Sequence, residues 1–317
     1  MYNGVINVYK EAGYTSHDVI AKMRGILKQK KIGHTGTLDP EATGVLPVCL
    51  GQGTKLCDML TDKTKTYQAV LLLGRETDTQ DTTGELLAEC PVEVTPEQVE
   101  GAVMSFVGDY AQIPPMYSAL KVNGKKLYEL ARAGKEVERE ARPVVIYSIV
   151  IDEIALPRVT MTVNCSKGTY IRTLCHDIGR ALGCGGCMEK LLRTQVDRFL
   201  LKDSLTLEQI EALRDEGRLS EAIVPVDEMF AAYPAVRTRP EADYLVHNGN
   251  QVKRELLQIG QTLEPRPASA GTEQLGDALS PARIYDSEGQ FIGVYEFQPE
   301  KDWYKPRKIF LGGQETG

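Results

Sequence analysis

The stretch Gly33-His34-Thr35-Gly36-Thr37-Leu38-Asp39-Pro40-Glu41-Ala42-Thr43-Gly44 is the densest run of special residues in the chain. Its three glycines allow a positive φ or the close approach of a ligand, and Pro40 biases Asp39 towards an extended backbone. We therefore expect a rigid loop that holds the Asp39 carboxylate on a non-helical backbone. The residues alone fit two interpretations equally: a site for a polyanionic substrate that uses His34 and Asp39, or a structural turn in which Asp39 caps neighbouring amides.

Strands and helices alternate around this loop. Residues 4–9 form a predicted strand, and Ser16 is expected to cap a helix over 17–28. Thr95 opens a second helix with a capping box, and this helix is expected to close at Gly108. The other predicted elements are strands over 45–50, 67–73 and 159–165 and a helix over about 169–182. The pattern predicts an α/β or α+β fold with a mixed or antiparallel sheet, and it lacks the glycine motifs of Rossmann and P-loop nucleotide sites.

The 317 residues suggest about two domains. A basic segment at 121–142 resembles a mobile insertion. After Tyr233 the pattern changes to short strands with glycine turns, at 282–285 and 291–297. Between them and the preceding domain, residues 260–280 are rich in Pro, Ser, Ala and Gly and are predicted to be a loop. We therefore expect a small β-rich domain at the C-terminal end.

Composition restricts the class of protein. Hydrophobic residues make up 42% and charged residues 26% of the chain, which is typical of a globular protein. The chain shows no secretory signal and no apolar run long enough to span a membrane, and its seven scattered cysteines are typical of reduced core thiols, so we expect a cytoplasmic location. Cys184-x-x-Cys187 lacks a second ligand pair, so we expect no metal.

The net charge of −7 is a mild argument against a nucleic-acid partner. The charge is unevenly distributed, however. Acidic residues gather in 76–109 and 203–228, whereas lysines and arginines gather in 22–31, 121–142 and 167–198. We expect the distribution, rather than the sum, to decide which partner binds.

The run at 33–44 closely resembles the signature G-H-x-G-x-L-D-P-x-A-x-G-x-L of the TruB family of pseudouridine synthases. Further motifs of that family are matched in order at 65–67, 77–84, 112–121 and 165–172. The resemblance covers nearly all of residues 4–230, and the C-terminal tail resembles an RNA-binding domain of the PUA type. One departure lies near the start, where the usual Asp-Lys-Pro is replaced by Tyr9-Lys10-Glu11.

The resemblance implies an α+β fold: a mixed, mainly antiparallel sheet with flanking helices, followed by a small β-rich PUA-like domain. It implies a catalytic domain over 1–230 with a thumb-like insertion at about 115–143, and a PUA-like domain over 231–317. It also implies the isomerisation of uridine to pseudouridine in RNA. Asp39 is then the essential carboxylate, Arg172 is the arginine that keeps it ionised and aimed, and Tyr67 stacks on the extruded uracil.

Further residues are expected to bind the substrate. The target base has to leave its loop, and His34 is expected to occupy the gap, while Leu191 is expected to line the uracil pocket. The remaining substrate-binding candidates are Gly36, Thr37, Lys10 and Tyr170. The RNA implied by the resemblance is the T-arm of tRNA, modified at the T-loop uridine (position 55). No cofactor or metal is expected, and the protein is expected to act as a monomer without a protein partner or a membrane.

Three alternative functions fit some of these features. A guide-RNA-dependent enzyme of the dyskerin type shares the signature but usually carries terminal extensions, whereas the first strand here is expected at about residue 4. A non-catalytic RNA-binding or RNA-folding module would not need Asp39, Tyr67 and Arg172 together. A phosphate-binding enzyme would need a P-loop and a glycosidase-like enzyme a second catalytic carboxylate, and the sequence identifies neither.

Overall fold

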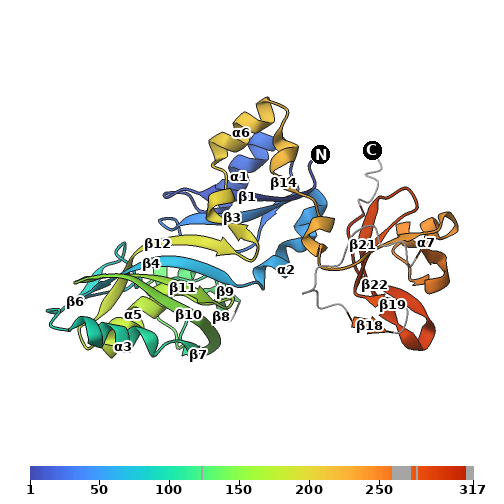
Figure 1. Ribbon diagram of the computed structural model, residues 1–317. Coiled ribbons are helices and arrows are strands. Elements are labelled where there is room, and N and C mark those ends of the chain that lie inside the picture. The colour runs from blue at the N-terminus through green and yellow to red at the C-terminus, as the bar shows by residue number, and fades with distance from the viewer. Residues whose placement is uncertain (123, 259–272, 276–277, 312–317) are drawn as a thin grey trace.

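A ten-stranded mixed sheet forms the body of the N-terminal part of the protein (Figure 1). The computed structural model describes residues 1–122, 124–258, 273–275 and 278–311. The strand order is β14-β1-β3-β12-β4-β11-β10-β7, with β2 added to β3 and β13 added to β12. The strands are β1 (Gly4–Lys10), β2 (Ile32–His34), β3 (Thr43–Leu50), β4 (Lys65–Leu73), β7 (Gly108–Gln112), β10 (Arg142–Ala155), β11 (Arg158–Cys165), β12 (Gly186–Val196), β13 (Phe199–Leu200) and β14 (Ile223–Val224).

One strand pair in this sheet determines where the candidate site forms. Its strands pair antiparallel except β12 and β3, which run parallel through Leu192 opposite Thr43 and Arg193 opposite Gly44. A side chain at Gly44 would collide with the Arg193 carbonyl at 2.2 Å, so only glycine fits this close approach. The loop at 33–44 therefore reaches the middle of the sheet, beside β12 and β4.

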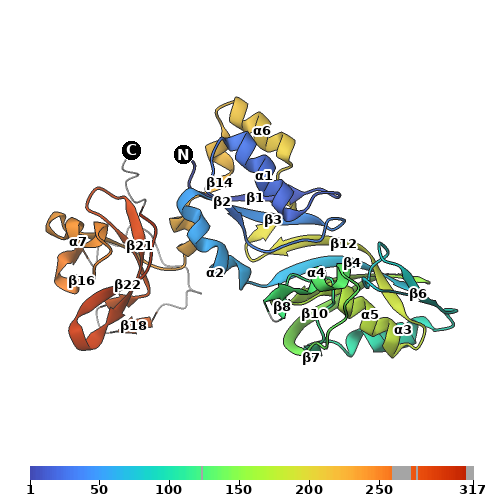
Figure 2. The same cartoon turned by 180° about the vertical axis from the view of Figure 1, so that it is seen from behind.

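Helices cover both faces of the sheet (Figures 1 and 2). The helices α3 (Pro96–Met104) and α5 (Ile171–Ala181) pack on β4, β10 and β11 around a core that includes Leu71, Met161 and Leu174. The helices α1 (Ser16–Leu27) and α6 (Leu207–Asp215) cover β1 and β3 around a second core. The observed architecture confirms the predicted α+β class.

The predicted strands are present, and the helix boundaries need correction. The cap of α1 is Thr15, which forms a capping box with Asp18, and not Ser16. Ser16 is buried, and its hydroxyl accepts a hydrogen bond from the Leu38 amide at 2.9 Å, so this serine ties α1 to the loop instead. The capping box at Thr95 is confirmed, but α3 ends at Met104, and Gly108 begins β7.

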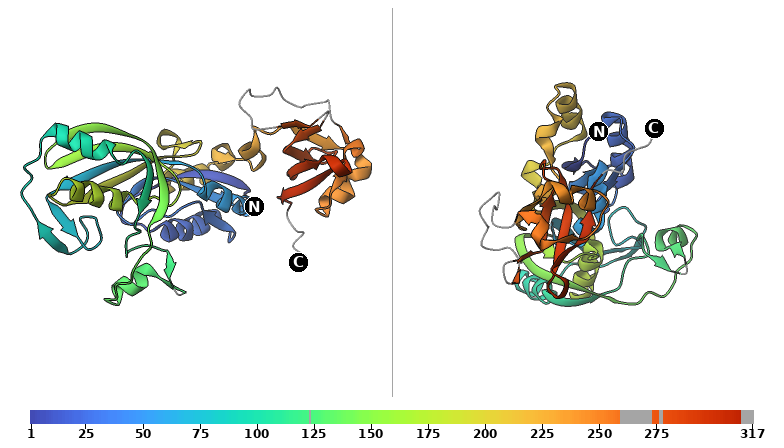
Figure 3. Two further views of the ribbon diagram at one scale, coloured as in Figure 1. Left: turned by 90° about the horizontal axis from the view of Figure 1, so that it is seen from below. Right: turned by 90° about the vertical axis from the view of Figure 1, so that its right-hand side faces the viewer.

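Smaller elements extend from the body. A hairpin of β5 (Arg75–Thr77) and β6 (Leu86–Glu89) follows β4, and the helix α2 (Cys57–Thr61) precedes it. The basic segment forms a separate unit that projects from the sheet in Figure 3. That unit contains β8 (Lys121–Val122), β9 (Lys125–Lys126) and α4 (Leu127–Arg132).

A second, six-stranded sheet in the order β16-β22-β21-β20-β15-β17 makes up the C-terminal part. Its elements are β15 (Ala235–Thr238), α7 (Asp243–His247), β16 (Val252–Lys253), β17 (Leu257–Gln258), β20 (Ala282–Tyr285), β21 (Phe291–Gln298) and β22 (Trp303–Ile309). The predicted β-rich domain is thereby confirmed. The prediction of a loop over 260–280 was wrong in part, because β18 (Glu273–Leu275) and β19 (Ala278–Ser280) pair with each other. Residues 259–272 lie outside the described residues.

The two parts meet in a shared apolar cluster. Phe291 of β21 and Phe310, which follows β22, form this cluster with Phe230 and with Val45 and Leu56 of the body. The Lys55 ammonium also donates a hydrogen bond to the Ile309 carbonyl at 2.9 Å. These contacts bring the C-terminal sheet against the end of the body near α2 (Figure 1).

Candidate active site

Main-chain hydrogen bonds hold the loop that carries Asp39. The Lys10 ammonium is buried beneath the loop and donates to the carbonyls of Pro40 at 2.8 Å, Ala42 at 2.6 Å and Glu11 at 3.1 Å. These three bonds can satisfy all three donors of the ammonium. The Asp39 backbone is thus held by contacts that do not use its own side chain, which leaves the carboxylate available.

Arg172, in the first turn of α5, forms a bidentate pair with Asp39. Its Nε lies 3.0 Å from Asp39 Oδ2, and its Nη2 donates to Oδ1 at 3.3 Å. The arginine side chain is only 6% exposed, whereas that of Asp39 is 40% exposed. Burial raises the pKa of Asp39, and the Arg172 charge opposes this shift. The pair thus holds an ionisable carboxylate that is partly exposed. The buried guanidinium fixes the orientation of this carboxylate.

The Arg172 guanidinium has further partners that sequence reasoning missed. It donates to the carbonyls of Thr79 at 3.0 Å and Tyr117 at 2.9 Å, and its Nη1 lies 3.6 Å from Asp81 Oδ2. Asp81 is itself fixed by Thr83, whose amide donates to it at 3.0 Å. The available signal was the dense run of Thr and Asp at 77–83, which is typical of a turn built on side-chain caps. The loop between β5 and β6 and the segment just before β8 therefore meet at one guanidinium.

Replacing Asp81 by Asn tests whether this second carboxylate matters. We expect uridine conversion at neutral pH to slow by about tenfold, because the guanidinium loses one of its charge-assisted contacts. Asp81 also raises the pKa of Asp39, so the acid limb of the rate profile should move to lower pH. Single-turnover rates between pH 5 and 8 measure both effects. An unchanged rate and profile would mean that the carbonyls of Thr79 and Tyr117 suffice.

Tyr67 and Leu191 lie on neighbouring strands beside the loop. Tyr67 of β4 is buried, and it belongs to the same core cluster as Leu38; Leu191 of β12 packs against that cluster. Leu191 pairs with Ala69 in the sheet register. Ala69 is two residues from Tyr67 along β4, so Leu191 and Tyr67 lie on the same face of the sheet. Burial raises the pKa of the Tyr67 hydroxyl. The structure thus brings together a phenol, an aliphatic side chain and the loop.

His34, Gly36 and Thr37 lie in the first half of the loop at 33–44. The His34 ring stands edge-on to His17, with 5.5 Å between ring centres, and its Nδ1 accepts a hydrogen bond from the Gly36 amide at 3.3 Å. Burial lowers the pKa of His34 to about 4, so the ring is neutral at physiological pH. Thr37 is exposed. Tyr170, at the N-terminus of α5, is held by paired hydrogen bonds between its backbone and the Gln112 side chain at 2.8 and 3.0 Å.

Lys10 occupies a different place from the other substrate-binding candidates, because its ammonium is enclosed by carbonyls. Burial lowers the pKa of Lys10 to about 8, against 10.5 for an exposed lysine. The folded state therefore releases this proton at a lower pH than the unfolded chain does, and the free energy of unfolding should rise with pH above 8.

The variant Lys10→Met removes this titration. Between pH 7.5 and 9.5 we expect the wild-type protein to gain about 2 kcal/mol of unfolding free energy relative to Lys10→Met, from the pKa difference alone. Denaturant titrations at both pH values give this difference. A constant difference would show that the Lys10 ammonium keeps an ordinary pKa.

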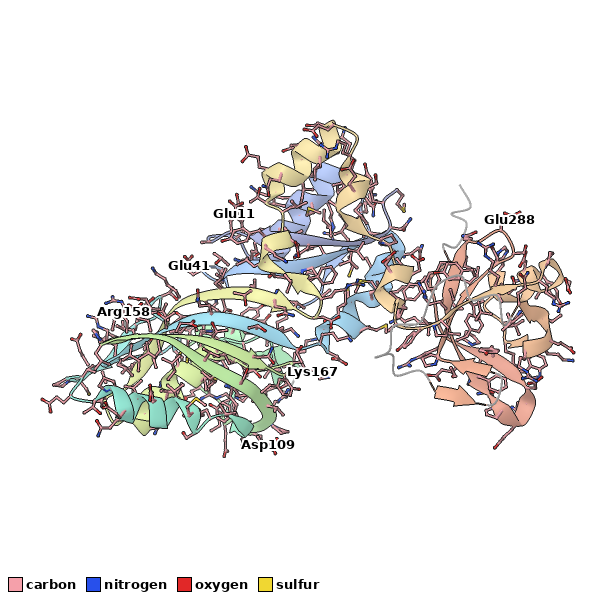
Figure 4. The ribbon with its side chains drawn as sticks, in the orientation of Figure 1. Glu11, Glu41, Asp109, Arg158, Lys167 and Glu288 are labelled. Carbon is pink, nitrogen blue, oxygen red and sulfur yellow. The ribbon has the colours of Figure 1, made fainter. Side chains whose placement is uncertain are left out.

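Exposed basic side chains lie on the insertion and beside β4. Lys167, labelled in Figure 4, lies beside the start of β4 and pairs with Asp62 at 2.8 Å. Lys121, Lys125, Arg132 and Lys135 of the insertion are exposed. Within the described part of the chain, no group of three or more His, Cys, Asp or Glu side chains could hold a metal ion. No helix among the described residues is long and apolar enough to cross a membrane.

Comparisons with known proteins agree with this geometry. Residues 24–171 match the model of the TruB family pseudouridylate synthase N-terminal domain, and residues 172–231 match that of the tRNA pseudouridylate synthase B C-terminal domain. Proteins named tRNA pseudouridine synthase B from Lachnoclostridium phytofermentans and Lactococcus lactis subsp. cremoris are 51% and 40% identical to this chain. Each match covers 98% of this chain, and 100% and 98% of those relatives.

Solved structures show the same architecture. A chain described as "Crystal Structure of a Cbf5-Nop10-Gar1 Complex" matches with a TM-score of 0.69 and 26% identity, over 97% of this chain and 85% of that one. The confirmed resemblance thus rests on the signature loop, on the fold and on full-length relatives. The chain belongs to the TruB family of pseudouridylate synthases.

Proposed function

We propose that this protein isomerises uridine to pseudouridine in tRNA, at the T-loop uridine (position 55), with Asp39 as its essential carboxylate. The observation that carries the proposal is the bidentate Arg172–Asp39 pair on a loop held by Lys10 and Ser16. The relatives named tRNA pseudouridine synthase B support tRNA as the substrate. The catalytic domain is then residues 1–230 with the insertion at about 115–143, and residues 231–317 form the PUA-like domain.

The reaction breaks the bond between C1′ and N1, turns the uracil and joins its C5 to C1′; C5 then loses its hydrogen as a proton, and N1 gains a proton. A carboxylate can act in this sequence as a nucleophile at C1′ or at C6, or as a base that starts glycal formation. Each role needs Asp39 ionised, and Arg172 favours that form by its charge, by the close ion pair with Oδ2 and by a hydrogen bond to Oδ1. Arg172 is thus a positioning residue for the catalytic carboxylate.

The target uridine has to be extruded before it meets Asp39. Tyr67 supplies an aromatic face for the flipped uracil, and Leu191 supplies an apolar wall beside it. A neutral His34 at the loop entry suits the space left in the RNA, since base stacking on aromatic rings needs no charge. Gly36, Thr37 and Tyr170 complete the proposed substrate contacts. Lys10 acts indirectly, because its ammonium holds the loop through the Pro40 and Ala42 carbonyls.

Phosphate contacts are expected from the exposed lysines and arginines of the insertion, despite the net charge of −7. We expect tRNA affinity to fall roughly tenfold or more between 50 and 200 mM salt, because bound counterions are released. Lys121→Gln with Lys125→Gln should make the slope of log K against log salt shallower. Arg218→Gln is the matched control, because Arg218 pairs with Glu216 and Glu221 on an acidic segment. A salt-independent affinity would contradict the proposed interface.

Mapping pseudouridine in an unmodified tRNA transcript tests the proposed target. The protein should convert the T-loop uridine and leave a transcript with cytidine at that position unmodified. Conversion at another position would refute the T-loop assignment while leaving the activity intact. Activity only after a guide RNA is added would favour a dyskerin-type enzyme.

We propose that the protein works in the cytoplasm as a monomer and without a protein partner, so the purified chain alone should convert the transcript.

A further inference from the structure

Arg193 of β12 is a buried cation without a charged partner among the described residues. Its exposed fraction is 1%. Its Nε donates to the Val45 carbonyl at 2.7 Å, and its Nη2 donates to the Gly36 carbonyl at 3.2 Å. Neither contact is with a carboxylate. Burying an ionised group this way is unfavourable unless other contacts compensate, so the position calls for a reason beyond packing.

The position of Arg193 joins two parts of the proposed site. Gly36 precedes Asp39 by three residues in the loop, and its carbonyl is one of the two hydrogen-bonded carbonyls. Tyr67 is the direct cross-strand partner of Arg193 in the β4–β12 register, so both side chains lie on the same face of the sheet. Arg193 therefore contacts the Asp39 loop and also lies on the same face as the proposed uracil-stacking ring.

The Arg193 guanidinium is close enough to the Tyr67 hydroxyl to affect the pKa of that hydroxyl. Burial raises the pKa of the Tyr67 hydroxyl, and the charge of Arg193 and a hydrogen bond from it oppose this shift. A guanidinium presents its donors in a planar fork. It can therefore hold the hydroxyl and the Gly36 carbonyl at a set separation, which the point charge of a lysine cannot do.

We infer that Arg193 is a positioning residue for the reaction: it fixes the Tyr67 ring relative to the loop that carries Asp39. The inference rests on the proposed function, because it assumes that Tyr67 and Asp39 act on the same uridine. Arg193 is distinct from Arg172, which fixes the carboxylate itself. The two arginines thus orient two separate groups of one site.

A double-mutant cycle between Arg193 and Tyr67 separates this role from a purely structural one. Single-turnover conversion of a tRNA transcript is measured for the wild-type protein and for Arg193→Lys, Tyr67→Phe and the double variant. Arg193→Lys keeps the positive charge, so this variant is expected to fold. We expect Arg193→Lys to slow conversion by roughly tenfold or more in the wild-type background. In the Tyr67→Phe background, where no hydroxyl remains to be positioned, it should change the rate by less than about twofold.

Binding and structure complete the test. tRNA affinity of Arg193→Lys should stay within about threefold of the wild-type value, since phosphate contacts lie elsewhere. A crystal structure of Arg193→Lys should show the Tyr67 ring displaced or in several conformers, and it decides the matter if Tyr67→Phe proves too slow to measure. An equal slowing in both backgrounds, or an unmoved ring, would overturn the inference. An inactive wild-type protein would instead refute the proposed function.

Discussion

Replacing Asp39 by Asn is expected to remove uridine conversion, with a loss on the order of 10⁴-fold in the single-turnover rate. Asparagine has nearly the same shape as aspartate, but it carries no charge and cannot act as a nucleophile or a base. The loop should keep its conformation, because Lys10 and Ser16 hold it through the main chain. Arg172 also keeps Asp81 as a charged neighbour, so the variant should fold.

The measurement for Asp39→Asn is a paired one. Conversion is followed in single turnover with enzyme in excess, and tRNA binding is followed by filter retention at the same salt. Binding within about threefold of the wild-type value is expected, because phosphate contacts dominate affinity. Loss of binding together with conversion would mean that Asp39 is structural, as in the turn interpretation of residues 33–44.

Arg172→Met should give the second-largest effect, a loss of roughly 10³-fold at neutral pH. The guanidinium lowers the pKa of Asp39 against the effect of burial. Without it, burial and the neighbouring Asp81 both raise that pKa, so less of the carboxylate is ionised at a given pH. The acid limb of the rate profile should consequently move to higher pH, opposite to the shift expected for Asp81→Asn.

Arg172→Lys is the matched variant. It keeps the charge but loses the fork that contacts both oxygens of Asp39. We expect a smaller loss of roughly 10²-fold and a smaller displacement of the acid limb. Rates from pH 5.5 to 8.5 for both variants test this order. An acid limb that stays in place in Arg172→Met would show that Arg172 does not control the ionisation of Asp39.

Local patterns were sufficient to predict much of the fold. Alternation identified β1 and β11, and the Thr95 capping box identified α3. The strand β12 was missed because bulges between Met188 and Lys190 and between Arg193 and Gln195 break its alternation. Its inward Arg193 also looks like a surface residue in sequence. Helix ends were misplaced where a tertiary contact decided them, as when Ser16 bonds the Leu38 amide.

Some residues of the candidate site could likewise be predicted from local sequence, and others could not. The loop and Arg172 were found because their motifs are contiguous in sequence and match a known family. Asp81 and Arg193 were missed as site residues because their importance arises from contacts across the fold: Asp81 meets a helix 91 positions away, and Arg193 meets Gly36 from 157 positions away. No pattern within one segment reports such pairings. Arg193 in particular stands in a stretch that also holds Glu189 and Lys190, so its charge alone did not single it out.

The most direct test of the account uses the purified chain alone, with an unmodified tRNA transcript carrying tritium at C5 of its uridines. Joining C5 to C1′ displaces the C5 hydrogen, so each conversion releases one tritium into water. We predict the release of one equivalent per tRNA from the wild-type protein, without guide RNA or a second protein, and none from Asp39→Asn. Absence of release from a folded wild-type protein that binds the transcript would contradict the central claim.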